Sequence, residues 1–364
     1  RLSGTLDIYQ KKTTDLLISR NLPGSAGFSS TYYNQGSLNN KGVEFSLNAQ
    51  IIDSSSWKWS VSGNIGVNRN EISDLGLLPA DFGCLGERVG YYGNSLGDHF
   101  GVGHIFLAGE APGLFYGYVT QGIVQKEDIT ENGIKYIKQD GSVGYYQTVN
   151  KTTPVAGDVK YVDRNGDGVV DDNDIVAVGA TNRPNLIYGL GLSVKWKGLD
   201  VNLHFQGAGK SQFFLSGKCI RAFSEGQWGN IIKGTLDNRW VDADTAEKLG
   251  IAANEDPNAT FPRLSYTDQG NGNTTIYAYT NNYRNSTYWL RDGSYVRLKT
   301  VDIGYTLPKA LVNKIHFNNV RIFLTGTNLL TWSSFKLWDP EMGSNNGEKY
   351  PLSKSVTLGL SVNL

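Results

Sequence analysis

The chain has 364 residues, the length of one large β domain or two smaller ones. It is rich in Gly (44) and Tyr (20) and poor in Met (1), a composition that favours strands and turns over helices. Lys plus Arg (34) balance Asp plus Glu (34), so charge gives no reason to expect a nucleic-acid partner. No apolar run of about 18 residues is present, which excludes a transmembrane helix but not membrane-crossing strands.

The first predicted elements are strands near the N-terminus. Alternation predicts a strand from residue 1, interrupted by a turn at 11–14, and the Gly-, Ser- and Asn-rich stretch 21–36 predicts a loop. A hairpin with strands at 42–51 and 57–67 follows. The sequence begins within a strand pattern and carries no signal peptide, so we expect the chain to be part of a longer exported protein.

The middle of the chain is predicted to be a long loop region. Over residues 71–184 regular alternation weakens, and a connection of this length is usually functional. A second hairpin follows, with strands at 186–196 and 199–207 around a tight turn. Farther along, residues 242–249 are compatible with one or two helical turns.

The C-terminal stretch 286–364 shows the clearest alternation. Residues 288–308, 320–331 and 355–364 alternate between apolar and polar or small side chains with period two, in runs of about ten residues. This pattern suits tilted strands with one apolar and one polar face. It predicts an all-β fold: a transmembrane antiparallel β-barrel in a bacterial outer membrane, with short periplasmic turns and long extracellular loops.

Tyr and Trp residues gather near the predicted strand ends. We interpret most of them as girdles between lipid and water, with stacking platforms for sugars as the alternative. The residues concerned are Trp57, Trp59, Tyr188, Trp196, Tyr288, Trp289, Tyr295, Tyr305 and Trp332. For aromatic residues in the predicted loops both interpretations stay open, and these are Tyr91, Tyr92, Phe115, Tyr116 and Tyr118.

The sharpest chemical motif is the acidic segment 163–174. Oxygen-bearing side chains stand at positions 1, 3, 5, 9 and 12 and Gly at position 6, the pattern of an EF-hand calcium loop. The predicted metal ligands are Asp163, Asn165, Asp167, Val169 through its carbonyl, Asp171 and Asp174. The last ligand is Asp rather than the usual Glu, and a solvated acidic turn is the alternative. No second loop accompanies it, so calcium is expected to stiffen the loop rather than to act as a signal.

No pattern typical of an enzyme is present. The sequence contains neither a Gly-x-Ser-x-Gly elbow nor a Ser/His/Asp order, and its four His have no metal-ligand spacing. We therefore expect no enzymatic activity and predict no catalytic residues. The residues that contact a substrate are not identifiable from the sequence.

Motifs along nearly the whole chain, in matching order, resemble SusC/RagA-type TonB-dependent transporters. The segments that carry the resemblance are Asn39–Phe45, Gly109–Tyr118, Gly157–Asp174, Phe205–Gly207, Tyr295–Lys299, Gly304–Pro308, Gly326–Leu329 and Asp339–Glu341. The resemblance implies that residues 1–364 are the C-terminal part of such a barrel, without the N-terminal plug and first strands. It also implies that loop region 71–184 faces outside the cell.

The family resemblance further implies import of oligomeric nutrients, for which we favour oligosaccharides over oligopeptides. The expected partners are a SusD-like surface lipoprotein, the plug-bearing remainder of the transporter, TonB through that remainder, and the lipid bilayer. Two alternatives remain from the residues alone. A secreted, calcium-stabilised glycan-binding β module would bury the apolar faces of its strands internally, and a hydrolase on a β scaffold would turn over a model substrate.

Overall fold

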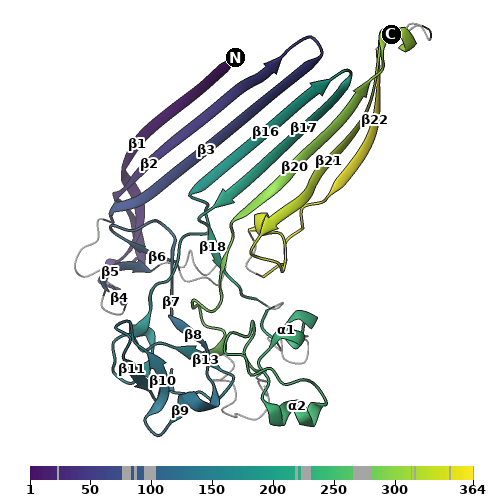
Figure 1. The fold of residues 1–364 in the computed structure, drawn as a ribbon. Helices are drawn as coiled ribbons and strands as arrows, with labels where there is room; N and C mark the ends of the chain where they lie inside the picture. Colours follow the sequence, from purple (N-terminus) through teal and green to yellow (C-terminus); the bar gives the residue numbers. More distant parts are fainter. Residues whose placement is uncertain are drawn as a thin grey trace.

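Eight long strands form one antiparallel sheet in which neighbours in the chain are neighbours in space (Figure 1). The computed structural model describes residues 1–22, 24–75, 83–85, 88–93, 104–217, 220–222, 231–264, 281–312, 314, 317–343 and 346–363. The strands of the sheet are β1 (Leu2–Asn21), β2 (Ser30–Asp53), β3 (Trp57–Asp74), β16 (Leu186–Trp196), β17 (Leu199–Gly209), β20 (Tyr295–Thr306), β21 (Asn319–Ser333) and β22 (Ser355–Asn363).

Short and long connections lie at opposite ends of this sheet (Figure 1). Residues 54–56 and 197–198 make the turns at one end, where the connection from β20 to β21 also lies (Figure 1); the described part of that connection contains α4 (Lys309–Val312). The connections between β3 and β16 and between β17 and β20 are long and lie at the other end. This asymmetry is typical of outer-membrane barrels, whose short turns are periplasmic and whose long loops are extracellular.

One face of the sheet is apolar, and its side chains align in rows across the strands because the register is continuous. The row nearest the short turns consists of Trp57, Trp196, Leu199, Tyr305, Ile322 and Leu360. The next row consists of Trp59, Val194, Val201, Ile303, Leu324 and Leu358. Most of these side chains are exposed. The internally buried apolar face required by the secreted-module alternative is therefore contradicted.

The height of the apolar face matches a membrane. On β3 it runs from Trp57 to Val67, which is roughly 33 Å of strand at about 3.3 Å per residue. At a tilt of about 40° this length spans about 25 Å along the membrane normal, the height of the apolar band of outer-membrane barrels. The rings of Trp57 and Trp196 lie 6.2 Å apart in the row at the short-turn end, where a girdle was predicted.

The opposite face of the sheet is polar and carries an ionic cluster that joins three strands. Arg321 on β21 donates to Asp200 on β17 (Nη2 to Oδ2, 2.6 Å) and to Asp302 on β20 (Nη2 to Oδ1, 2.5 Å). To reach Asp200, the side chain of Arg321 passes over Gly304 of the intervening strand, where a Cβ would collide with its guanidinium. Thr325 also donates to Asp302 (2.7 Å).

The N-terminal strands correct the prediction in two places. Lys11 to Thr14 do not form a turn, because β1 continues to Asn21 with register shifts between Thr13 and Leu17. The predicted loop 21–36 is also wrong, since β2 begins at Ser30 and pairs with the last part of β1.

Short elements fill the long-loop end of the molecule, where region 71–184 was predicted to be loop; of that region, 76–82, 86–87 and 94–103 lie outside the described residues. The strands of this end are β4 (Gly83–Leu85), β5 (Arg88–Gly93), β6 (His104–Leu107), β7 (Leu114–Gly117), β8 (Thr120–Ile123), β9 (Ile129–Thr130), β10 (Gly133–Ile137), β11 (Val143–Tyr146), β12 (Thr148–Val149), β13 (Val159–Tyr161), β14 (Val169–Val170), β15 (Val176–Ala177), β18 (Gln212–Phe214) and β19 (Leu290–Asp292).

The helical elements here are short: η4 (Lys126–Asp128), η5 (Asp172–Asp174), α1 (Lys233–Asn238), α2 (Ala243–Leu249) and η8 (Pro340–Met342), with η1 (Gly24–Ala26) between β1 and β2. In the part of the chain that the structure describes, no helix is both long and apolar enough to cross a membrane. The helical turns predicted at 242–249 are confirmed as α2, which Asp242 caps by accepting from the Thr245 amide (2.8 Å).

Charge placement on the two faces of β3 gives a first prediction. Val61 lies in the middle of the apolar band and Ser62, its neighbour, on the polar face. Because an Arg at the lipid midplane costs about 2–4 kcal/mol whereas the inner face tolerates charge, Val61→Arg should lower the free energy of unfolding by that amount. The measurement is the urea midpoint of the complete barrel protein folded in lipid vesicles. Ser62→Arg is the matched control, and equal losses in both variants would contradict the assignment of faces.

Candidate functional site

The described part of the long-loop end is a folded unit with two large aromatic cores and a smaller cluster of Ile123, Trp240 and Ala259, rather than a set of extended loops. One core joins residues far apart in sequence, namely Phe115, Phe213, Phe214, Leu215, Ile220, Phe261, Tyr283, Trp289 and Phe335. The other lies around β8, β10, β11, β13 and β14 and contains Tyr118, Val124, Ile134, Tyr136, Tyr146, Val149, Val159, Tyr161, Val162 and Val170. Such cores hold the connecting segments in fixed positions.

These cores correct several aromatic predictions. Trp289 is only 1% exposed and stacks on Tyr283, and Tyr295 is buried, so these two are not girdle residues. Tyr288 donates its hydroxyl to the Ala259 carbonyl (2.7 Å) inside the unit, so the girdle prediction is wrong there too. The loop aromatics Phe115, Tyr116 and Tyr118 are buried, which excludes them as open stacking platforms. The side chains of Tyr91 and Tyr92 lie outside the described part.

The acidic loop 163–174 closes on itself through its first residue. The Asp163 carboxylate accepts from the amides of Gly166 (Oδ1, 2.6 Å) and Gly168 (Oδ2, 2.8 Å). Both glycines have positive φ, 77° and 87°, a conformation that favours Gly. The hydroxyl of Tyr136 donates to the Asp163 carbonyl (2.8 Å) and ties the loop to the aromatic core.

The last loop residue, Asp174, is brought back against the first turn. Its Oδ1 accepts from the Arg164 amide (2.6 Å) and its Oδ2 from the Asp171 amide (2.9 Å). Asp174 is fully buried and Asp163 is 3% exposed. Burial raises the pKa of Asp174, and the nearby Asp163 carboxylate adds to the rise, whereas the backbone amides oppose it. No basic side chain of the described residues forms an ion pair with either carboxylate.

The remaining predicted ligands occupy the same loop. Asn165 and Asp167 bond to each other, from Nδ2 of Asn165 to Oδ2 of Asp167 (2.9 Å), and Asp171 accepts from the Asn173 amide (2.8 Å). Val169 lies in β14, which pairs in parallel with β12. Within the described ranges no three His, Cys, Asp or Glu side chains converge as a metal-binding group. The donor set is still all oxygen, and two buried carboxylates without a basic partner suit a hard divalent cation.

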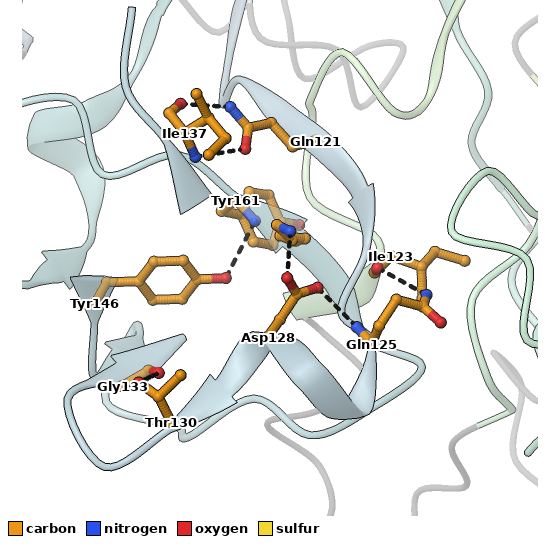
Figure 2. A network of polar contacts seen from close by, with 10 residues as sticks. Gln121, Ile123, Gln125, Asp128, Thr130, Gly133, Ile137, Tyr146 and Tyr161 are labelled. Carbon is orange, nitrogen blue, oxygen red and sulfur yellow. Dashed lines mark hydrogen bonds and ion pairs between the residues drawn. The ribbon is translucent and has the colours of Figure 1, made fainter. Parts of the chain in front are cut away.

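A cleft of about 640 Å³ opens beside the acidic loop. One wall comes from the loop itself through Arg164, Asn165 and Asn173, and apolar side chains of 175–178 supply another. Gln121 forms part of the rim. Its side-chain amide pairs with both backbone groups of Ile137, accepting from the amide (2.9 Å) and donating to the carbonyl, as Figure 2 shows. The side chains of Gln139 and Asn173 also line the cleft.

The polar contacts in Figure 2 connect β8 with β10, and β13 with η4 and β11. Asp128 accepts from the amide of Gln125 (2.9 Å) and from Nζ of Lys160 (2.8 Å) on β13. The hydroxyl of Tyr146 on β11 accepts from the Tyr161 amide (3.2 Å). Burial raises the pKa of Tyr146 and of Tyr161, so both phenols stay neutral and their hydroxyls serve as hydrogen-bond groups.

A buried carboxylate that sequence reasoning missed joins three segments of the unit. Asp158 pairs with Arg263 (Oδ1 to Nε, 2.6 Å), accepts from Asn282 Nδ2 (2.9 Å) and accepts from the Val155 amide (3.0 Å). In the sequence Asp158 stands only as the residue after Gly157 at the start of a resembling motif. Its side-chain partners Arg263 and Asn282 lie more than a hundred residues away, so no local pattern identifies them.

A second buried ion pair holds the connection after β21 against β20. Arg297 is 1% exposed and donates to Asp339 (Nη2 to Oδ1, 2.5 Å), with Glu341 3.3 Å from its Nε. Asp339 also accepts from the Glu341 amide (2.9 Å) and so caps η8. The motif Asp339–Glu341 is thereby a structural anchor for its loop.

Removal of Asp158 tests whether this carboxylate holds the unit together. Asp158→Ala leaves Arg263 and Asn282 without their acceptor, and losing one member of a buried pair costs about 3 kcal/mol. Amide hydrogen exchange over 155–161 and 281–284 should therefore speed up by roughly a hundredfold. The control is Asp237→Ala, which breaks an exposed pair with Lys233 and should cost less than about 1 kcal/mol. Unchanged exchange in Asp158→Ala would refute the bracing role.

No family model matches the chain. It aligns over its full length with "TonB-dependent receptor P26" of Formosa agariphila at 30% identity, covering 33% of that protein. It also aligns over its full length with "TonB-dependent receptor SusC" of Bacteroides thetaiotaomicron at 25% identity, covering 30% of that protein. The chain thus spans about one third of the length of the curated relatives it matches. These relatives are named as receptors and not as enzymes.

The fold is found in solved structures of the same kind. The structure of the RagAB peptide transporter matches all of the present chain with a TM-score of 0.68 at 24% identity. The match covers 33% of the aligned RagAB chain. The RagAB peptide importer in its "open-open" state matches with a TM-score of 0.66 at 23% identity and equal coverage. In sequence the chain is similar to one third of TonB-dependent receptors of the SusC kind, and in fold to one third of the RagAB transporter, so it is part of an outer-membrane β-barrel.

Proposed function

We propose that the chain is the C-terminal part of a TonB-dependent importer that takes up an oligomeric nutrient. The observation that carries the proposal is an exposed apolar face, of membrane height, that crosses the described strands of a sheet with a folded unit at its long-loop end. The sheet supplies barrel wall, and the unit supplies a rigid surface where ligand is first met. On this proposal an N-terminal plug segment completes the barrel, TonB acts through that segment, and a SusD-like surface lipoprotein covers the outer end.

The cargo that we place first is an oligosaccharide, and an oligopeptide is the second candidate. The cleft beside the acidic loop supports the first, because amide side chains such as Gln139 and Asn173 above an apolar wall suit a ligand rich in hydroxyl groups. The name of the RagAB peptide transporter, whose fold matches, favours the second. Both ligands would reach the cleft from the outer side.

A binding and uptake experiment tests this proposal on the complete transporter with its lipoprotein. Gln139→Ala combined with Asn173→Ala should weaken binding of the preferred oligosaccharide roughly tenfold, since each lost hydrogen bond contributes about 1 kcal/mol or somewhat less. Calorimetric titration against neutral oligosaccharide and peptide mixtures measures the affinity. Asn258→Ala, an exposed amide away from the cleft, is the control.

Uptake separates the remaining outcomes. Radiolabelled ligand should enter wild-type cells and not cells without TonB. If only peptides bind, the cargo is an oligopeptide rather than an oligosaccharide. Uptake that continues without TonB, or no binding of either class, would contradict the proposed function.

We further propose that the acidic loop binds calcium as a structural ion through Asp163, Asn165, Asp167, the Val169 carbonyl, Asp171 and Asp174. Calcium would neutralise the buried carboxylates and stiffen the loop wall of the cleft. The burial of Asp163 and Asp174 without a basic partner in the described residues supports this assignment.

Calcium removal gives the corresponding prediction. At a calcium concentration a hundredfold above Kd, the bound ion should stabilise the folded unit by about 2.7 kcal/mol. Chelation should therefore increase protease cutting within 163–174 of the complete protein, and Asp163→Asn with Asp174→Asn should abolish the calcium effect. Asp140→Asn, in an exposed turn outside the loop, is the control. If the rate of protease cutting within 163–174 is the same with calcium, magnesium or chelator, the proposed calcium site is refuted.

A further inference from the structure

The outward face of β1, β2 and β3 changes from apolar to basic within one row of side chains. Ile8, Val43 and Val67 pair across the three strands and form the last apolar row at the long-loop end. The next outward row consists of Gln10, Lys41 and Arg69, and the one after it of Lys12, Asn39 and Glu71. The register has no shift in these rows, so the alternation of faces is uninterrupted.

The basic side chains lie at the height of lipid headgroups. Arg69 stands two residues beyond Val67 on β3, which is about 7 Å of strand and roughly 5 Å along the membrane normal at the usual tilt. The long-loop end of such a barrel is extracellular, so this level corresponds to the outer leaflet. In contrast, the neighbouring Lys11 alternates to the polar inner face.

These cations are available to a ligand. Lys12, Lys41 and Arg69 are exposed, and within the described ranges no ion pair engages any of them. Glu71 is the acidic side chain of the same rows, and its carboxylate makes no ion pair with them. Lys41 and Arg69 are direct cross-strand partners, an arrangement of like charges that costs free energy unless an anion lies between them.

We propose that Lys12, Lys41 and Arg69 form a binding site for the phosphate of an outer-leaflet lipid headgroup. The Arg69 guanidinium offers a planar fork to phosphate oxygens, and the two ammonium groups add point charges on flexible stems. The acyl chains of the same lipid lie along the apolar rows of Val43 and Val67. This combination of charge beside a lipid-facing strip is what distinguishes a lipid from a soluble phosphate. The site is independent of the imported cargo.

The test uses the complete transporter in lipid nanodiscs that contain phosphatidylcholine and a bis-phosphorylated glycolipid. Native mass spectrometry counts the glycolipids that each protein retains as the collision energy rises. The combined variant Lys12→Gln, Lys41→Gln and Arg69→Gln should retain glycolipid at least tenfold less, since each basic side chain near a membrane surface contributes about a fivefold effect. The charge-preserving variant Lys41→Arg with Arg69→Lys should retain it, which separates charge from folding.

Controls decide whether the effect belongs to this site. Lys11→Gln removes one charge from the same strand on the opposite face and should leave retention unchanged. Equal retention by the combined variant and wild type would overturn the proposal, as would an equal loss in Lys11→Gln. Displacement of the glycolipid by millimolar inorganic phosphate would also overturn it, because the site would then recognise free anions rather than a lipid.

Discussion

The structure depends on one constraint: a backbone that passes through hydrocarbon must satisfy its own hydrogen bonds. In a sheet this is done between strands, so the side chains alone decide what each face meets. In this chain the outward rows are apolar from β3 to β22, and the inner face carries serines, asparagines and the Arg321 cluster. Both faces follow from a single period-two pattern read in a fixed register.

Beyond the membrane level the constraint disappears and the chain folds by other rules. Water satisfies exposed backbone groups there, so short strands, 3₁₀ turns and irregular segments can form. Aromatic side chains avoid water by packing together in cores. Ion pairs hold some of the buried charges of this unit, as Asp158 with Arg263 and Arg297 with Asp339 show. An aromatic residue near a strand end can therefore have either of two environments. Trp196 faces lipid, whereas Trp289 packs inside a core.

This division explains how much could be predicted from the sequence. The second hairpin was predicted to within a few residues, because alternation is strongest where the two faces meet different media. The first hairpin was predicted at its short-turn end, but β2 begins earlier, at Ser30, and β3 ends later, at Asp74. The prediction failed for 21–36, where β2 pairs with the last part of β1 although the sequence shows no regular alternation of apolar and polar residues. The acidic loop was found by its local spacing, whereas the Asp158 contacts depend on residues distant in the chain. The ion in that loop remains a proposal.

The ionic cluster on the inner face has a consequence for assembly. Apolar alternation repeats every two residues, so a strand that slips by two positions still presents its apolar side chains to lipid, and burial alone would not reveal the error. The charges are not periodic. A two-residue slip of β21 along β20 in the direction away from Gly304 would carry Arg321 away from Asp302 and Asp200, and both ion pairs would be lost. The ion pairs therefore favour one register of these three strands, whereas the much larger apolar surface does not distinguish registers that differ by two residues.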